Sequence, residues 1–316
     1  MGRIQIESPG PLTTVQDLGR IGYMDSGFPQ SGAVDWYAAS LANILCKNEE
    51  NSAVLEITLG GFSCRFLSSL AFALCGAHVQ AALDGVPVPA GRCVLADAGS
   101  VLQIGMADAG CRIYLAVSGG FDVPLIMGSR STDLRCGIGG FAGRSLRRGD
   151  VLSVFPGGGF TRDAFATQEK ILCGEVPIRA IPGPQDDYFT RAGLRTFFSG
   201  VYTVTPASDR MGMKLSGPAP AAALETDIVS DGIALGSVQI PAGGQPIILL
   251  ADRQTVGGYA KIATVIKGDL PRLAQLRPGD RIRFIKTNRK SALAVLQEMQ
   301  NTLADIKRQL QKRDQV

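Results

Sequence analysis

The chain has 316 residues, of which 45% are hydrophobic and 19% are charged, and its formal net charge is +4. This length and composition allow a sizeable core and favour two domains. The charged fraction lies below the roughly 25% of typical globular proteins, which suggests that a partner covers part of the surface. Basic residues cluster only near the C-terminus, where a solvated helix face explains them better than a nucleic-acid site. They are Lys307, Arg308, Lys312 and Arg313.

The N-terminus and the cysteines bear on the compartment. MGRIQIESPG has no apolar signal core, and no run of about 18 apolar residues predicts a membrane span. The seven cysteines include no CxxC spacing, so no zinc site is expected. We interpret them as buried free thiols and expect a cytoplasmic protein that binds neither a metal nor a membrane.

His78 is the single histidine, and it lies between apolar residues in LCGAHVQAAL. We expect a partly buried structural side chain there. One histidine excludes self-contained triads and multi-histidine metal sites. Catalysis would therefore depend on carboxylates, Lys, Arg, Tyr, backbone dipoles or residues of a partner.

Short β-like runs bounded by Gly, Pro or Asp dominate the chain, with a few helical segments between them. Helices are expected at residues 34–46, near 186–198 and at about 289–312. In the last segment apolar residues recur in steps of three and four, at Leu296, Met299, Leu303, Ile306 and Leu310. The strand-like runs are 69–75, 92–99, 100–106, 111–120, 150–155, 200–205, 236–241, 245–252, 260–266 and 280–285. This spacing is typical of sandwiches and barrels, so the predicted fold class is mainly β.

Composition shifts between residues 156 and 178, which are Gly-rich, then polar, then proline-bearing. We therefore predict a first β-domain at 1–160, a second at 161–286 and a helical tail at 287–316. Each β-domain closes with an R-x-G-D turn and a strand, at 147–150 and at 277–280. Two related domains would explain this repeat, and so would convergent turn chemistry.

Three stretches combine glycine with Asp, Arg and Gln, at residues 13–35, 208–217 and 250–261. They are explained either by buried Asp–Arg pairs that lock loops, or by a backbone that approaches a ligand closely. GIGGFAG at 137–143 and GGGF at 157–160 lack the GxxxxGK[ST] pattern of a phosphate loop. Ser118 lacks the G-x-S-x-G setting of a hydrolase nucleophile.

Ordered blocks follow one another from about residue 5 to 286. They include TTVQDLGRIGY, SGAVD, LEITLGG, SRSTDLRCGIGGFAGRSLRRGD, SDRMGMKLSGP and SDGIALGSVQIPAGGQPIILLADRQTVGGYAKIATVI. On these blocks the chain resembles the biotin-dependent carboxyltransferase-like family that includes allophanate hydrolase subunit 2 and the C subunit of 5-oxoprolinase. The resemblance implies two cyclophilin-like β-barrel domains, with a few short helices and the C-terminal helix. It also implies a separate partner similar to allophanate hydrolase subunit 1.

The function implied by the resemblance is that of the C subunit in an ATP-dependent 5-oxoprolinase. There, the subunit-1-like B subunit and the lactam-handling A subunit join it to open the small-molecule substrate 5-oxoproline to glutamate. ATP is expected at the complex, at an unknown site. Two alternatives stay open: a carboxyltransferase-type subunit that degrades urea or allophanate, and a regulatory protein that antagonises a kinase-inhibitor homologue of subunit 1. MKL at 213–215 differs from the A-M-K-M biotin-attachment motif, so no covalently bound biotin is expected.

In this interpretation, Arg210 and Arg253 grip a carboxylate or phosphate, while Asp209 and Asp252 orient them or transfer protons. The substrate-binding rim is expected to consist of Gln254, Thr255, Gly257, Gly258 and Tyr259. Four further residues are expected to serve either the site or the subunit contact, namely Gln16, Asp17, Arg20 and Asp35.

Overall fold

A computed structural model describes residues 1–157, 165–166, 171 and 174–313. The chain forms two compact units. The first unit consists of Met1–Ile21, Ser31–Ile171 and Met299–Val316, and the second unit consists of Gly22–Gln30 and Leu172–Glu298. The predicted boundary between residues 160 and 161 lies outside the described residues, as do most of GGGF and Cys173.

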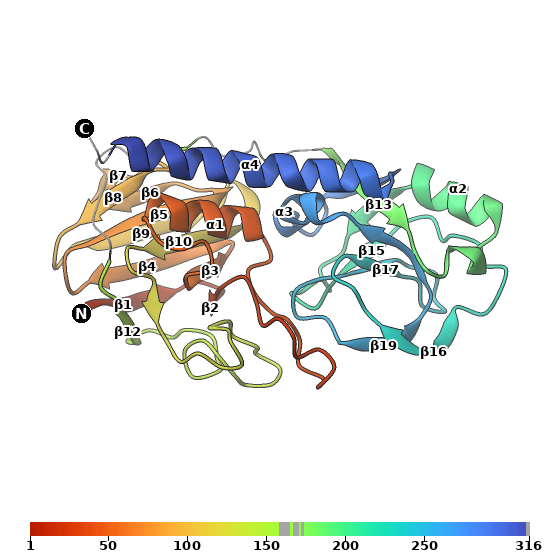
Figure 1. Cartoon of the computed structure of the whole chain (residues 1–316), viewed down its shortest axis with the longest axis horizontal. Helices are drawn as coiled ribbons and strands as arrows, with labels where there is room; N and C mark the ends of the chain where they lie inside the picture. The colour runs from red at the N-terminus through yellow and green to blue at the C-terminus, as the bar shows by residue number, and fades with distance from the viewer. Residues whose placement is uncertain (158–164, 167–170, 172–173, 314–316) are drawn as a thin grey trace. The chain divides into compact units, whose positions relative to one another are not determined.

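The first unit contains two β-sheets and one helix of its own (Figure 1). Its elements are β1 (Gly2–Pro9), β2 (Leu12–Gln16), α1 (Trp36–Leu45), β3 (Val54–Thr58), β4 (Gly60–Phe66), β5 (Leu70–His78), β6 (Ala81–Leu83), β7 (Val86–Pro87), β8 (Cys93–Ala96), β9 (Val101–Met106), β10 (Ala109–Val117), β11 (Phe121–Asp122) and β12 (Val151–Val154). One sheet has the order β11-β12-β1-β4-β9-β6-β7, and the other has the order β2-β3-β10-β5-β8.

Strand periodicity builds the core of the first unit. Along β4, Phe62, Cys64 and Phe66 are buried while their neighbours are partly exposed, as the two-residue repeat of a strand requires. Strand β5 is buried on both faces, because Phe72 joins the core between the sheets and Ala73 joins a cluster with α1. The second face explains why its sequence is a continuous apolar run rather than an alternating one.

The second unit is built around a closed barrel. Its elements are β13 (Glu175–Pro182), η1 (Asp186–Tyr188), α2 (Arg191–Ser199), β14 (Val201–Val204), β15 (Gly212–Ser216), β16 (Asp227–Gly232), β17 (Ser237–Gln239), β18 (Ile247–Leu249), β19 (Val256–Tyr259), β20 (Lys261–Val265), η2 (Lys267–Asp269), α3 (Leu270–Ala274) and β21 (Arg281–Lys286). The barrel order is β13-β20-β17-β18-β15-β14-β21, and β13 pairs with β21 in parallel. Strands β16 and β19 form a separate two-stranded ribbon (Figure 1).

Aromatic side chains pack α2 against strands β14 and β21 of the barrel. The rings of Phe197 and Phe284 stack with centroids 4.4 Å apart, and Tyr202 meets Phe284 edge-on at 5.6 Å. All three side chains are buried. Helix α2 begins at Thr190, whose hydroxyl accepts a hydrogen bond from the backbone of Gly193, as an N-cap residue does.

Helix α4 (Arg289–Arg313) is the predicted tail helix. In its first-unit portion, Leu303 and Leu310 are buried in the cluster that contains α1, and Ile306 packs against that cluster. The three-and-four spacing of these residues places them on one face of the helix. The helix therefore packs through this face on its own chain.

The two R-x-G-D turns have the same hydrogen bonds. The carboxylates of Asp150 and Asp280 each accept the backbone N–H three residues earlier at 2.7 Å, from Arg147 and Arg277. Gly149 and Gly279 have φ of +91° and +95°, which side-chain-bearing residues rarely adopt. The repeat therefore encodes one local turn in both units, ahead of β12 and β21.

The mainly-β prediction is confirmed, and each expected strand-like run overlaps a strand. Two expectations about single residues are wrong. His78 is 71% exposed beside Asp108, because it ends β5 and projects past the core. Cys136 is exposed on a loop, whereas Cys46, Cys64, Cys75, Cys93 and Cys111 are buried thiols as expected. No helix among the described residues is long and apolar enough to cross a membrane.

Candidate functional site

Asp17 organises a polar cluster in the first unit, directly after β2. One carboxylate oxygen accepts the backbone N–H of Gly19 at 2.8 Å and the hydroxyl of Ser129 at 2.7 Å, and it also accepts the hydroxyl of Ser131. The other accepts the backbone N–H of Arg130 at 2.6 Å. Asp17 is 3% exposed. Four hydrogen bonds therefore converge on this carboxylate, and it holds the 126–143 loop against β2.

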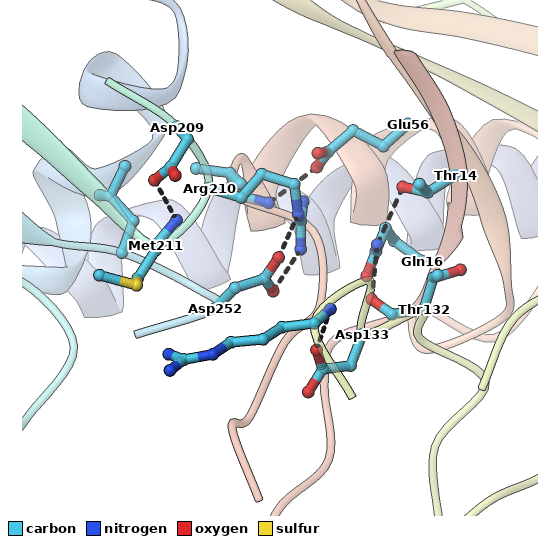
Figure 2. A network of polar contacts seen from close by, with 12 residues as sticks. Thr14, Gln16, Glu56, Thr132, Asp133, Asp209, Arg210, Met211 and Asp252 are labelled. Atoms are coloured by element: carbon cyan, nitrogen blue, oxygen red, sulfur yellow. Dashed lines mark hydrogen bonds and ion pairs between the residues drawn. The ribbon is translucent and has the colours of Figure 1, made fainter. Parts of the chain in front are cut away.

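Gln16 and Arg20 serve the same loop. The amide of Gln16 donates to Thr14 at 2.9 Å and to the carbonyl of Thr132 at 3.2 Å (Figure 2). The guanidinium of Arg20 donates to the carbonyls of Ile126 and Ser131, at 3.3 and 3.1 Å. Arg20 is fully buried, and its Nη1 has no hydrogen-bond partner among the described residues.

The glycines of GIGGFAG fit this packing. Gly139 has φ +70°, and a Cβ there would lie 2.0 Å from the carbonyl oxygen of Ser131. No side chain fits at that distance. The glycine is required because this segment of the loop lies against the backbone that Asp17 and Arg20 hold.

Asp35 caps α1, accepting the backbone N–H of Ala38 at 2.9 Å. Its own N–H donates to the hydroxyl of Tyr114 at 2.8 Å, and that hydroxyl donates to Glu56 at 2.7 Å. Burial, and then the carboxylates of Glu56 and Asp35, raise the pKa of Tyr114 well above its ordinary value. Sequence reasoning did not single out Glu56 or Tyr114, because both lie within otherwise apolar strand runs.

In the second unit, Arg210 and Asp252 form a buried two-point ion pair. Nε of Arg210 is 2.8 Å from one carboxylate oxygen of Asp252, and Nη2 is 3.0 Å from the other (Figure 2). The side chains are 5% and 13% exposed. Asp209 is exposed and accepts the backbone N–H groups of Met211 and Gly212, at 2.8 and 3.0 Å. Its carboxylate thus forms the turn and does not orient Arg210 through any described hydrogen bond.

Arg253 differs from its neighbour. It is 3% exposed and has no carboxylate partner among the described residues. Nε donates to the carbonyl of Ile233 at 2.9 Å, Nη1 to the carbonyl of Leu250 at 3.5 Å and Nη2 to the sulfur of Met24 at 3.4 Å. Burial lowers the pKa of Arg253 to about 10, so the guanidinium stays charged at neutral pH. A guanidinium has five N–H donors, so each Nη keeps one for an anion.

Gly257, Gly258 and Tyr259 of the predicted rim lie in β19 of the β16–β19 ribbon, and Gln254 and Thr255 directly precede that strand. Gln254 is exposed, and the carbonyl of Thr255 accepts the backbone N–H of Ile233 at 3.0 Å. Gly257 pairs with Asp231 in the ribbon, and Tyr259 pairs with Asp227 and is 41% exposed. A Cβ on Gly257 would lie 2.7 Å from Ile233, whereas one on Gly258 would lie 3.2 Å from the nearest backbone oxygen. The ribbon thus contacts Ile233, whose carbonyl Arg253 binds.

Lys261 is a second buried cation that sequence reasoning missed. Its side chain is 3% exposed. Its ammonium is 3.0 Å from the carboxylate of Asp231, which is the ammonium's one hydrogen-bond partner in the described part of the chain. The pKa of Asp231 is lowered, first by this hydrogen bond and then by the N–H of Gly232. Gln239, also buried, lies behind Gly257. The available signal was a lysine inside the apolar run AKIATVI, because lysine is almost never fully buried without a role for its charge.

Arg253 and Lys261 flank the ribbon, and both contact the segment from Asp231 to Ile233. Such an arrangement suits a ligand with anionic oxygens, such as a carboxylate or a phosphate. In the described ranges, no group of three or more His, Cys, Asp or Glu side chains is placed to hold a metal ion.

Comparison with known proteins gives a consistent family. Residues 26–286 match the family described as carboxyltransferase domain, subdomain A and B. The chain is 41% identical to the C subunit of 5-oxoprolinase from Escherichia coli over 94% of this chain and 95% of that protein. It is 32% identical to a putative urea carboxylase of Emericella nidulans, of which it covers 26%. The crystal structure of Kluyveromyces lactis urea carboxylase aligns with a TM-score of 0.91 at 30% identity, over 96% of this chain and 29% of that one.

Proposed function

Because the chain belongs to the family of carboxyltransferase domains with subdomains A and B, we propose that it is the C subunit of an ATP-dependent 5-oxoprolinase. One observation carries this choice within the family. The likeness to the C subunit of the Escherichia coli 5-oxoprolinase extends over nearly the whole of both chains. The partners of the complex are a subunit-1-like protein, the B subunit, and a lactam-handling protein, the A subunit, and the complex works in the cytoplasm.

The reaction needs an activated lactam. Transfer of the γ-phosphoryl group of ATP to the lactam oxygen makes the ring carbon a better electrophile. Water then adds to that carbon and the ring carbon–nitrogen bond breaks, with the nitrogen leaving as the amine and an acyl phosphate remaining. A second water hydrolyses the acyl phosphate and releases inorganic phosphate. The products are glutamate, ADP and inorganic phosphate. The substrate carries a carboxylate throughout, and the activated form carries a phosphoryl group as well.

Arg253 and Lys261 suit these two anionic groups. Arg253 has no carboxylate partner among the described residues and keeps one donor on each Nη, so it is the better site for the substrate carboxylate. Lys261 is paired with Asp231 through one of its three ammonium N–H donors, and the other donors serve the oxygen that becomes phosphorylated. Arg210 and Asp252 hold the segment that carries Arg253 and are not part of the binding site.

The second candidate is a carboxyltransferase-type subunit of a urea-degrading enzyme. It is favoured by the close structural match to the urea carboxylase of Kluyveromyces lactis. In that case the complex would contain a biotin-bearing protein, and lactam opening would be absent.

The two functions are separated by reconstitution. The chain is purified with its subunit-1-like and lactam-handling partners, and glutamate release from 5-oxoproline is measured with and without ATP. ATP-dependent glutamate release is expected. Activity on urea or allophanate, together with none on 5-oxoproline, would overturn the proposal. Copurification of a biotinylated protein would point to the second candidate.

A further inference from the structure

A groove of about 500 Å³ opens on the second unit, between residues 220–227 and residues 240–244. Most of its lining is apolar or small, and Leu224, Ile240 and Pro241 are its larger apolar residues. Its two charged side chains are Glu225 and Asp227, and neither has an ion-pair partner among the described residues. The groove is therefore an apolar trough with two carboxylates.

The segment around this groove is acidic, whereas the chain as a whole has a net positive charge. The whole chain carries 32 Lys and Arg against 28 Asp and Glu, yet residues 217–252 contain no Lys or Arg. The acidic residues of that stretch are Glu225, Asp227, Asp231 and Asp252. Asp252 is neutralised by Arg210 and Asp231 by Lys261, which leaves Glu225 and Asp227 as the uncompensated charges of the stretch.

Exposed apolar side chains lie in the groove wall and along the adjoining β16–β19 ribbon. Leu224 in its wall is 57% exposed, and Tyr259, which pairs with Asp227, is 41% exposed. Val229 is 93% exposed, at the point where the register of β16 against β19 shifts. Almost every residue of β16 is exposed, and a two-stranded ribbon is marginal by itself. Such a surface is typical of a protein contact rather than of free solvent.

We propose that this groove and the exposed face of β16 dock a segment of the subunit-1-like partner that presents a Lys or Arg side chain flanked by apolar residues. The basic group lies between Glu225 and Asp227, and its apolar neighbours cover Leu224 and Val229. The volume is sufficient for one long side chain and part of its backbone. The partner's identity rests on the proposed function, whereas the chemistry rests on the groove.

We assign the surface to a second protein rather than a small ligand, because the exposed apolar side chains extend beyond the groove. A small cation would fill the trough but would leave Val229 and Tyr259 in water. A second copy of this chain would bring a net charge of +4 with its basic residues near the end of α4. That occupant would make the isolated chain self-associate, so it becomes an outcome of the test.

Calorimetric titration of this chain with the purified subunit-1-like protein tests the proposal. The double variant Glu225→Lys, Asp227→Lys reverses both charges at the groove. We expect a Kd at least about ten-fold weaker, because two like-charge contacts replace two attractive ones. The matched control is Asp97→Lys, on an exposed loop of the first unit, which should leave the Kd unchanged. Raising the salt concentration should weaken wild-type binding more than binding of the double variant.

Three results would overturn the docking surface. They are no binding by the wild-type chain, a Kd of the double variant within about two-fold of the wild-type value, and self-association of the isolated wild-type chain in analytical ultracentrifugation that the double variant abolishes. Val229→Ser gives an independent check without any change of charge, and a weaker Kd is expected. Glutamate release by the wild-type complex tests the function and does not depend on these Kd values.

Discussion

Asp17 in the first unit and Arg253 in the second unit are equally buried charges with opposite surroundings. The carboxylate of Asp17 accepts hydrogen bonds from two backbone N–H groups and two serine hydroxyls. The guanidinium of Arg253 has two carbonyl oxygens and a thioether sulfur as partners, and no carboxylate among the described residues. The first charge is satisfied by the fold itself, and the second is left with donors for a ligand.

The contrast continues within the second unit. The guanidinium of Arg210 lies beside the segment that carries Arg253, but it is held at two points by Asp252. A buried charge that is left without a partner lowers stability, so it persists where it serves another purpose. Arg210 and Asp17 are therefore expected to matter for stability, and Arg253 for binding. Variants of each residue test this difference between a role in stability and a role in binding.

The largest loss of stability is expected for Arg210→Met. The change leaves the carboxylate of Asp252 buried without its two-point partner, and breaking such a pair costs about 3–5 kcal/mol. Urea unfolding of the isolated chain measures the change. The matched control is Arg195→Met on α2, where the free energy of unfolding should fall by less than about 1 kcal/mol. Equal stability of Arg210→Met and wild type would show that Arg210 is available for a ligand.

The next largest loss is expected for Asp17→Ala. Its free energy of unfolding should fall by about 3 kcal/mol, because several buried donors lose their acceptor together. The first unit should unfold at a lower urea concentration. Asp97→Ala, at an exposed site in the same unit, serves as the control. If Asp17→Ala keeps wild-type stability but prevents assembly with the partners, then Asp17 belongs to the subunit contact instead.

A smaller and pH-dependent effect is expected at Asp150. Hydrogen bonds from Arg144, and then from the backbone of Arg147, hold the pKa of this carboxyl below its usual range. The stabilisation is therefore present above the ordinary pKa of about 4 and is lost as pH falls through the lower folded value. Asp150→Asn should be less stable than wild type at neutral pH, by about 1 kcal/mol, and the gap should close on acidification.

The sister turn provides the comparison for Asp150. Among the described residues Asp280 accepts the backbone N–H of Arg277, and no arginine side chain holds it as Arg144 holds Asp150. Asp280→Asn should therefore lose less stability at neutral pH. A loss at Asp280 equal to that at Asp150 would assign the stabilisation to the turn rather than to Arg144.

Local patterns predicted the fold well because they record burial directly. The three-and-four spacing of Leu303, Ile306 and Leu310 predicted a packed helix, and their side chains do face the cluster around α1. Gly149 and Gly279 predicted turns that require a positive φ. His78 was expected to be partly buried because its neighbours are apolar, but sequence alone does not show where a strand leaves the core.

The candidate site was harder to predict because pairing partners are distant in sequence. Arg210 and Arg253 look alike in the sequence. Only the fold shows that Arg210 is the paired arginine, because its partner Asp252 lies 42 residues away. Met24 lies 229 residues from Arg253, and its loop belongs to the second unit although both flanking segments belong to the first. Lys261 lacked any acidic neighbour in sequence, since Asp231 is 30 residues away.

The most direct test of the central claim compares stability with activity in Arg253→Met. The variant replaces a buried charge that has no carboxylate partner among the described residues, so the free energy of unfolding should change by no more than about 1 kcal/mol. ATP-dependent glutamate release by the reconstituted complex should fall about a hundred-fold, as the loss of two charge-assisted hydrogen bonds implies. The complex should still assemble in size-exclusion chromatography. Full activity in the assembled complex, or a loss of stability as large as that of Arg210→Met, would contradict the assignment of Arg253 to the anion site.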